Sequence, residues 1–278
     1  MRKIIFNSSM PRSGSELLQV ILNQNPNIYG SATSPLFDYI NNIRLCQENA
    51  EVKSQPKNMM YQSFLSTSLH AMVGYYKPIT NKPVVCDKSR SWMWQYDLLS
   101  KIMKRKPIML CMVRDLRDIF VSMEMNWRKN RHLPIGPDNA IELTNMTIEE
   151  RVAFWSQNHP VGFSTKRLLD AGEQNLLEDV FFIRYENFTR HPDEIMKEVY
   201  EYIKEPYYQH DFNNIVKTVE EDHSWHGPYG NHDVKKELNP FLQPHKKILT
   251  NDICNRIIDG HRWYFSAYYP EVLEQGKS

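Results

Sequence analysis

The sequence has 278 residues, of which 41% are hydrophobic and 24% charged, which is enough for a sizeable core. Lys and Arg number 34 and Asp and Glu 33, so bulk charge gives no reason to expect nucleic acid or an anionic membrane as a partner. The four cysteines form no C-x-x-C pair, which argues against a zinc site or a disulfide framework. No stretch fits a signal peptide or a membrane anchor, so we expect a cytoplasmic protein, with residues 1–278 forming a single domain.

Strands and helices are predicted to alternate along most of the chain. Short apolar runs predict strands at residues 3–6, 83–86, 108–113 and 180–183. Helical spacing predicts helices at 16–23, through 94–102, after Asp115, and at 193–203 and about 251–265. A capping box at Thr147 predicts a further helix that Pro160 kinks or ends. The order predicts an α/β three-layer fold with a central parallel sheet flanked by helices. About 70 C-terminal residues are expected to be a helical and irregular cover.

The first motif, Met10-Pro-Arg-Ser-Gly-Ser-Glu-Leu-Leu18, lies between the first predicted strand and its helix. Backbone N–H groups at a helix N-terminus attract an anion. Ser13 and Ser15 add hydroxyl donors, and Arg12 adds a permanent charge. The motif therefore predicts an anion cradle. It lacks the Gly-Lys-Ser/Thr of a Walker A loop, and the plainer alternative is an ordinary turn with an exposed arginine.

The second motif, Met112-Val-Arg-Asp-Leu-Arg-Asp-Ile-Phe-Val-Ser122, follows the most continuous apolar run of the chain. It puts Arg114 at the carboxyl end of a predicted buried strand, where open α/β sheets bind their ligands. Ser122 falls two turns into the next helix. The alternatives are a surface Arg–Asp pair or a Walker B-like magnesium site at Asp115, and the missing Walker A lysine weakens the latter.

In this order, the two motifs resemble those of the PAPS-dependent sulfotransferases (PAPS is 3′-phosphoadenosine-5′-phosphosulfate). They are closest in style to the tyrosylprotein sulfotransferases. Val85-Cys-Asp-Lys-Ser89 resembles the family's strand that supplies a catalytic lysine. Phe182-Ile-Arg-Tyr-Glu-Asn-Phe-Thr-Arg-His-Pro192 resembles the strand end whose tyrosine contacts the cofactor.

The resemblance implies that the three-layer fold is P-loop-like. It also implies sulfuryl transfer from PAPS to an acceptor hydroxyl on a carbohydrate, a small molecule or a peptide. It implies a 5′-phosphosulfate loop made, mostly through backbone N–H groups, of Arg12, Ser13, Gly14, Ser15, Glu16 and Leu17. It also implies that Arg114 and Ser122 bind the 3′-phosphate and that Tyr185 lies near the nucleotide. Lys88 and Arg12 are the implied catalytic cations, and no metal is needed. The plainer interpretation of Lys88 is a surface lysine paired with Asp87.

The catalytic base departs from the family pattern. Tyrosylprotein sulfotransferases carry a Glu shortly after the first helix, whereas the stretch Gly30-Ser-Ala-Thr-Ser34 has no carboxylate. A base must take the proton of the acceptor hydroxyl, and Asp38 is the nearest candidate. The alternative bases are three histidines: His70, His226 and His232.

Two other functions stay open at this stage. One is a P-loop nucleotide kinase, and the other is a non-catalytic nucleotide-binding protein of the same fold. The lysine pairs 235–236 and 246–247 are candidates for a residue that closes over the cofactor, as C-terminal segments of the family do.

Overall fold

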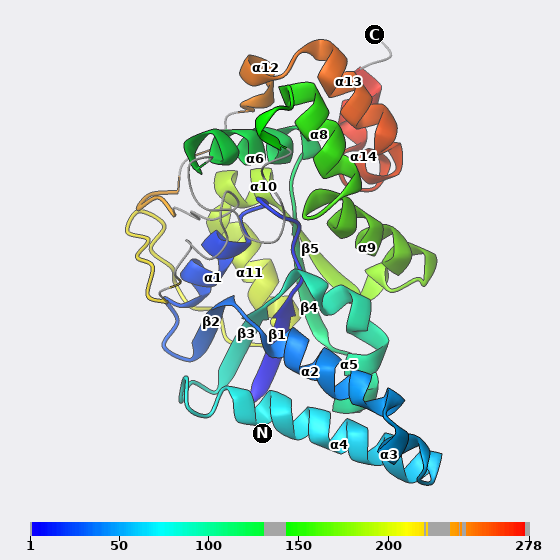
Figure 1. Ribbon diagram of the computed structural model, residues 1–278. Coiled ribbons are helices and arrows are strands. Elements are labelled where there is room, and N and C mark those ends of the chain that lie inside the picture. The colour runs from blue at the N-terminus through cyan, green and yellow to red at the C-terminus, as the bar shows by residue number, and fades with distance from the viewer. Residues whose placement is uncertain are drawn as a thin grey trace.

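A five-stranded parallel sheet forms the centre of the protein, with strand order β2-β3-β1-β4-β5 (Figure 1). The computed structural model describes residues 2–130, 143–219, 221, 234–238, 240 and 243–275. The strands are β1 (Lys3–Asn7), β2 (Ile28–Thr33), β3 (Val84–Lys88), β4 (Ile108–Val113) and β5 (Val180–Arg184). Because the strands are parallel, all their carboxyl ends lie at one edge, where α/β sheets hold their ligands. The predicted α/β fold with a central parallel sheet is therefore confirmed.

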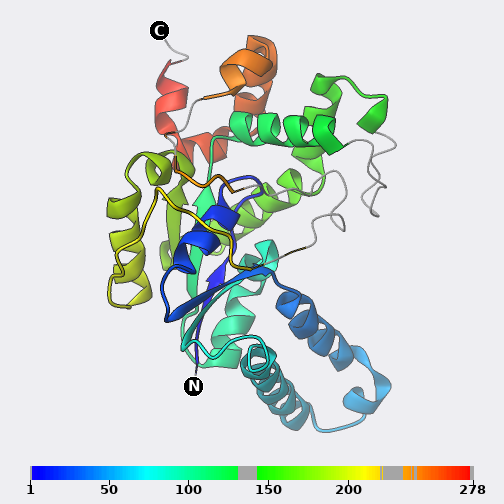
Figure 2. The ribbon, with the colours of Figure 1, turned by 90° about the vertical axis from the view of Figure 1, so that its left-hand side faces the viewer.

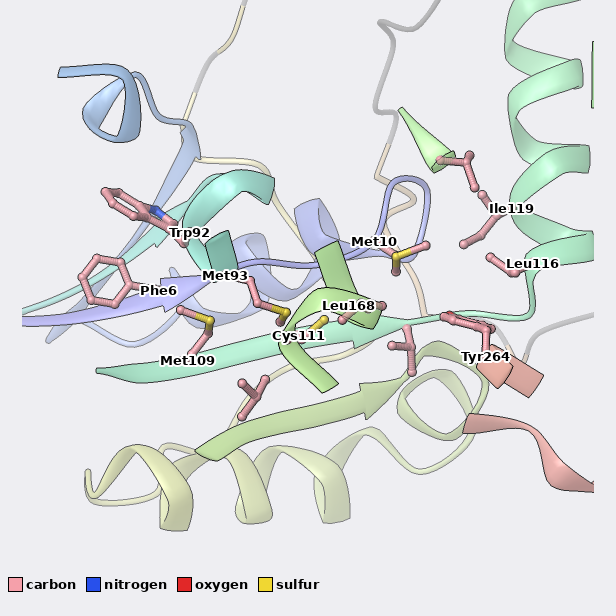
Figure 3. Close-up of a cluster of buried hydrophobic side chains, with 14 of the residues drawn as sticks. Phe6, Met10, Trp92, Met93, Met109, Cys111, Leu116, Ile119, Leu168 and Tyr264 are labelled. Carbon is pink, nitrogen blue, oxygen red and sulfur yellow. The ribbon is translucent and has the colours of Figure 1, made fainter. Parts of the chain in front are cut away.

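Both faces of the sheet are buried, so neighbouring residues of one strand enter two different cores. In β4, Met109, Cys111 and Val113 belong to the larger core, and Leu110 and Met112 to the smaller one. Figure 3 shows part of the larger core, where Phe6, Met109 and Cys111 of the sheet meet side chains of the covering elements. The same alternation determines the face of the sheet to which each polar residue at a strand end points, and therefore which residues it can contact.

Three helices supply the smaller core: α1 (Ser15–Leu22), α10 (Tyr185–Arg190) and α11 (Pro192–Ile203). The larger core is covered by η2 (Arg90–Gln95), α5 (Tyr96–Met103), α6 (Leu116–Asn130), α8 (Ile148–Gln157) and α9 (Val161–Glu173). Helices of the two groups described next also contribute side chains to it. Helix α1 directly follows β1, so its N-terminus lies at the carboxyl edge of the sheet. Helix α6 reaches the same edge after β4, on the other side.

Two further groups of elements lie at opposite ends of the molecule (Figures 1 and 2). One group comprises α2 (Leu36–Leu45), η1 (Cys46–Glu48), α3 (Ala50–Lys53) and α4 (Lys57–Tyr75). The other comprises α12 (His245–Ile248), α13 (Asn251–Gly260), α14 (Arg262–Tyr268) and α15 (Pro270–Gln275). A short η3 (Leu177–Asp179) precedes β5. Within the described residues, no helix has the length and apolar character needed to cross a bilayer.

The observed elements differ from the predicted ones in a few places. The edge strand β2 was not predicted, and the predicted helix at 251–265 is divided into α13 and α14 around His261. The capping box at Thr147 is present, with Thr147 Oγ1 accepting from the Glu150 N–H. Helix α8 ends before Pro160, which precedes α9, so this proline separates two helices as expected.

Candidate active site

The loop between β1 and α1 has the backbone that the first motif predicts for an anion cradle. Arg12 and Gly14 both have positive φ, at 54° and 90°, and Gly14 is the N-cap of α1. Left-handed backbone is unusual for a long side chain such as arginine, and such outliers gather at functional sites. The buried Ser13 hydroxyl donates to the Met10 carbonyl over 2.7 Å, which fixes the turn.

Gly14 also lies against the ring of Tyr185, and a Cβ atom at Gly14 would stand 2.6 Å from Tyr185 Cδ2. We expect Gly14→Ala to lower the free energy of unfolding by about 1–3 kcal/mol, from left-handed strain and overpacking. Urea denaturation measures this. Gly74→Ala in α4 is the matched control, because nothing lies within 4 Å of its added methyl group. Equal stability of Gly14→Ala and the wild type would contradict the packing described here.

Arg12, Arg114 and Ser122 meet at the carboxyl edge of the sheet, although they come from three segments. Arg12 Nε donates to Ser122 Oγ in α6 over 3.0 Å. Arg114 follows β4, and its Nη1 donates to the Arg12 carbonyl over 2.9 Å. Its guanidinium lies 4.6 Å from the ring centre of Tyr185, at the start of α10. The structure thus brings together the loop, the second motif and the segment 182–192, which contains Tyr185.

The C-terminal helices hold the backbone of Arg114 in place. The Tyr264 hydroxyl of α14 accepts from the Arg114 N–H over 3.3 Å and donates to the Arg114 carbonyl over 2.9 Å. Glu186 accepts from the Asp115 N–H over 3.1 Å and from the Tyr269 hydroxyl over 2.7 Å. Burial raises the pKa of both Tyr264 and Glu186, so the tyrosine stays a neutral donor. The sequence predicted a helix through Tyr264 but not its contacts with the backbone of Arg114.

Lys88 ends β3 and lies 8% exposed, in direct contact with the Glu16 carboxylate of α1. The other oxygen of Glu16 lies 2.9 Å from Lys217 Nζ, in the segment that follows α11. Burial acts to raise the pKa of Glu16, but Lys88 and then Lys217 outweigh it, so this pKa is lowered. One carboxylate therefore joins two lysines beside the loop. Lys217 was not predicted, because nothing in its local sequence marks it.

The suggested pairing of Lys88 with Asp87 is wrong, for a simple geometric reason. Successive residues of a strand point to opposite faces, so Lys88 faces α1 and Asp87 faces the larger core. Asp87 is fully buried there and accepts from the Tyr76 hydroxyl and, over 2.6 Å, from Trp92 Nε1. Burial raises the pKa of the Asp87 carboxyl.

Of the four candidate catalytic bases, two are exposed and two lie outside the described residues. Asp38 is exposed in the first turn of α2, which begins beside β3 because the Ser34 N–H donates to the Lys88 carbonyl over 2.9 Å. His70 is exposed on α4, and its ring bonds the Ser66 carbonyl over 2.7 Å. His226 and His232 lie outside the described residues.

The lysine pairs named as possible cofactor ligands are exposed. Lys236 contributes its backbone, since its carbonyl accepts from the Ile215 N–H over 2.7 Å. Lys246 and Lys247 lie on α12. Among lysines of the C-terminal part that the structure describes, Lys217 is the one in contact with Glu16.

Asp115, Asp118 and His245 place potential metal ligands within 4.8 Å of one another. Arg117 forms an ion pair with Asp115, with its Nε 3.0 Å from one carboxylate oxygen. His245 Nδ1 and Asp118 Oδ1 lie 2.8 Å apart. We interpret this cluster as a polar network that joins the start of α6 to α12.

The strand order and the loop at the carboxyl edge define a P-loop-like α/β protein. Among solved structures of this fold, the chain is similar to the sulfotransferase domain from the curacin biosynthetic pathway. That match has a TM-score of 0.54 at 17% identity and covers 93% of this chain and 97% of that one. A second match, to the sulfotransferase STF9 from Mycobacterium avium, has a TM-score of 0.51 at 15% identity and covers 96% and 77%.

The sulfotransferase domain family model matches residues 3–241 of the chain. The chain belongs to this family. No curated protein sequence gave a match. The family membership confirms the predicted reaction, which is sulfuryl transfer, and does not favour the kinase alternative.

Proposed function

We propose that the protein transfers a sulfuryl group from PAPS to an acceptor hydroxyl at the carboxyl edge of the sheet. The observation that carries this proposal is the bonded set of Arg12, Arg114 and Ser122, together with the buried Lys88, which contacts the first turn of α1. Such a set offers two permanent cations, a hydroxyl donor and an ammonium to one elongated anion. The acceptor is a carbohydrate, a small molecule or a peptide.

The residues present fit the charge and shape of PAPS. The left-handed backbone of Gly14 leads the loop into the first turn of α1, where backbone N–H groups attract an anion. Arg114 and Ser122 both contact Arg12, so one 3′-phosphate bound by Arg114 and Ser122 stays close to the loop. The ring of Tyr185, beneath the Arg114 guanidinium, provides an apolar surface for the nucleotide.

Each residue then has a separate task. PAPS supplies an activated sulfuryl group, and transfers of this type pass through a loose, in-line transition state. Arg12 and the N–H groups of residues 13–17 hold the 5′ end, and Arg114 and Ser122 hold the 3′ end. The Lys88 ammonium stabilises negative charge as it builds on the departing oxygen, which lowers the barrier of the chemical step.

Asp38 is the proposed acceptor of the hydroxyl proton. We expect Asp38→Asn to lower turnover by about 100-fold and to leave cofactor affinity almost unchanged, because only proton transfer is lost. Steady-state rates with a fixed acceptor measure turnover, and calorimetry measures cofactor affinity. Asp97→Asn is the control, since Asp97 is an exposed acid in the first turn of α5. Turnover of Asp38→Asn near that of the control would remove Asp38 from the mechanism.

Transfer of radiolabelled sulfate from PAPS into extract fractions tests the function and identifies the acceptor. We expect labelled product with the wild type in the absence of added magnesium. γ-Labelled ATP with magnesium is the parallel arm for a kinase. Label transferred from ATP and none from PAPS would overturn the proposal, and binding of PAPS without transfer from any fraction would favour a non-catalytic protein.

A further inference from the structure

The Glu16 carboxylate lies between two ammonium groups inside the proposed 5′-phosphosulfate site. Its Oε2 contacts Lys88 Nζ, and its Oε1 lies 2.9 Å from Lys217 Nζ. The side chains of Glu16 and Lys88 are each 10% exposed, and that of Lys217 is 25% exposed. In the described residues, Lys88 of β3 and Lys217 are the charged groups that face Glu16.

A buried carboxylate is an unexpected neighbour for a bound anion. Like charges that meet across a binding site weaken binding. Glu16 is in the first turn of α1, where backbone N–H groups attract the same anion. Each ammonium carries a single positive charge, so Glu16 and a 5′-phosphosulfate compete for the same two charges. A bound PAPS therefore weakens the contacts of Glu16 with the lysines.

We propose that Glu16 is a displaceable counter-ion, a positioning residue that orients Lys88 and Lys217 in the free enzyme and releases them to the 5′-phosphosulfate. The inference rests on the proposed function. In the free enzyme, the Glu16 carboxylate balances the charge of the two ammonium groups beside the loop. When the ligand binds, its negative charge takes over this role from the carboxylate.

Release of the lysines changes the pKa of the Glu16 carboxyl. In the free protein this pKa is lowered, because the two lysines outweigh the opposite effect of burial. When the lysines turn to the ligand, burial remains and a second anion lies nearby, so the pKa rises. A pKa that rises on binding means that binding takes up a proton. Wild-type affinity therefore increases as the pH falls through the raised pKa of the complex.

Calorimetric titration with adenosine 3′,5′-bisphosphate tests this without an acceptor. We compare wild type with Glu16→Gln in two buffers of different ionisation enthalpy, over a range from neutral to mildly acidic pH. We expect Glu16→Gln to bind about tenfold more tightly near neutral pH, since a competing anion is gone. We also expect it to take up fewer protons, and the two affinities to converge as the pH falls. Ionisation of the ligand phosphates is common to both proteins and cancels in the comparison.

Two controls isolate the release step. Adenosine 3′-monophosphate lacks the 5′ group, so its binding should not distinguish Glu16→Gln from wild type. Glu205→Gln removes the carboxylate of another lysine pair, in which Glu205 lies 2.7 Å from Lys3 at the amino end of β1. It should bind the bisphosphate with wild-type affinity and proton uptake.

Equal affinity and equal proton uptake in wild type and Glu16→Gln would overturn the inference, as would weaker binding by Glu16→Gln.

If Glu16→Gln fails to fold, Lys217→Met replaces it. That variant should lose about tenfold in affinity for the bisphosphate and nothing for the 3′-monophosphate, and unchanged binding of both nucleotides would overturn the inference. A wild type that does not bind the bisphosphate would overturn the proposed function itself, and a wild type that binds while Glu16→Gln behaves identically would overturn the inference alone.

Discussion

Lys88→Ala is expected to lower the rate constant of sulfuryl transfer by about 100- to 1,000-fold, with a modest effect on cofactor affinity. The ammonium interacts more strongly with the transition state, where charge builds on the departing oxygen, than with the ground state. The variant should remain folded, because Lys217 still neutralises Glu16. Single-turnover transfer with labelled PAPS measures the rate constant.

Lys88→Arg should restore only part of the lost rate, since a planar guanidinium does not replace a point charge at the same position. Thermal melts of the same variants separate catalysis from stability. If the pair of Lys88 with Glu16 only stabilises the fold, Lys88→Ala will melt at a lower temperature and transfer at the wild-type rate. That combination would contradict a catalytic role for Lys88.

Arg114→Ala is expected to weaken the binding of adenosine 3′,5′-bisphosphate by about 2–4 kcal/mol. The reason is the loss of a partly buried guanidinium that contacts Arg12 and lies over Tyr185. Binding of AMP, which has no 3′-phosphate, should change far less. Calorimetry with both nucleotides measures the difference.

Arg128→Ala is the matched control for Arg114→Ala. Arg128 lies in the same helix as Ser122, in the last turn of α6, but its side chain is 54% exposed and pairs with Glu124. It should bind both nucleotides as the wild type does. Equal losses of bisphosphate and AMP binding in Arg114→Ala would show that Arg114 does not read the 3′-phosphate.

The sequence predicted the buried strands well, because a strand covered on both faces leaves a continuous apolar run. Strand β4 has the predicted bounds of residues 108–113. Strand β2 was missed, since it contains Gly30 and polar residues and its residues 28–30 and 33 pair with β3. Gly30 is needed because a Cβ atom there would lie 2.6 Å from the Gln19 carbonyl oxygen, a contact that only the folded chain creates.

The candidate site was predictable wherever its residues follow a strand or begin a helix. Arg12, Lys88 and Arg114 come from such positions, and the parallel sheet brings them to one edge. A pair of Lys88 with Asp87 could have been excluded from the sequence, because strand alternation puts the two side chains on opposite faces of the sheet. Lys217 and Tyr264 were not predictable in this way, since they reach the site through tertiary packing from segments distant in sequence.

Binding of adenosine 3′,5′-bisphosphate compared with ATP, without added magnesium, tests the central claim most directly. The claim is that the carboxyl edge of the sheet binds PAPS, so the bisphosphate should bind more tightly than ATP and lose that advantage in Arg114→Ala. Calorimetry on wild type and variant gives both affinities in one set of titrations. Tighter binding of ATP, strengthened by magnesium and unaffected by Arg114→Ala, would contradict the claim.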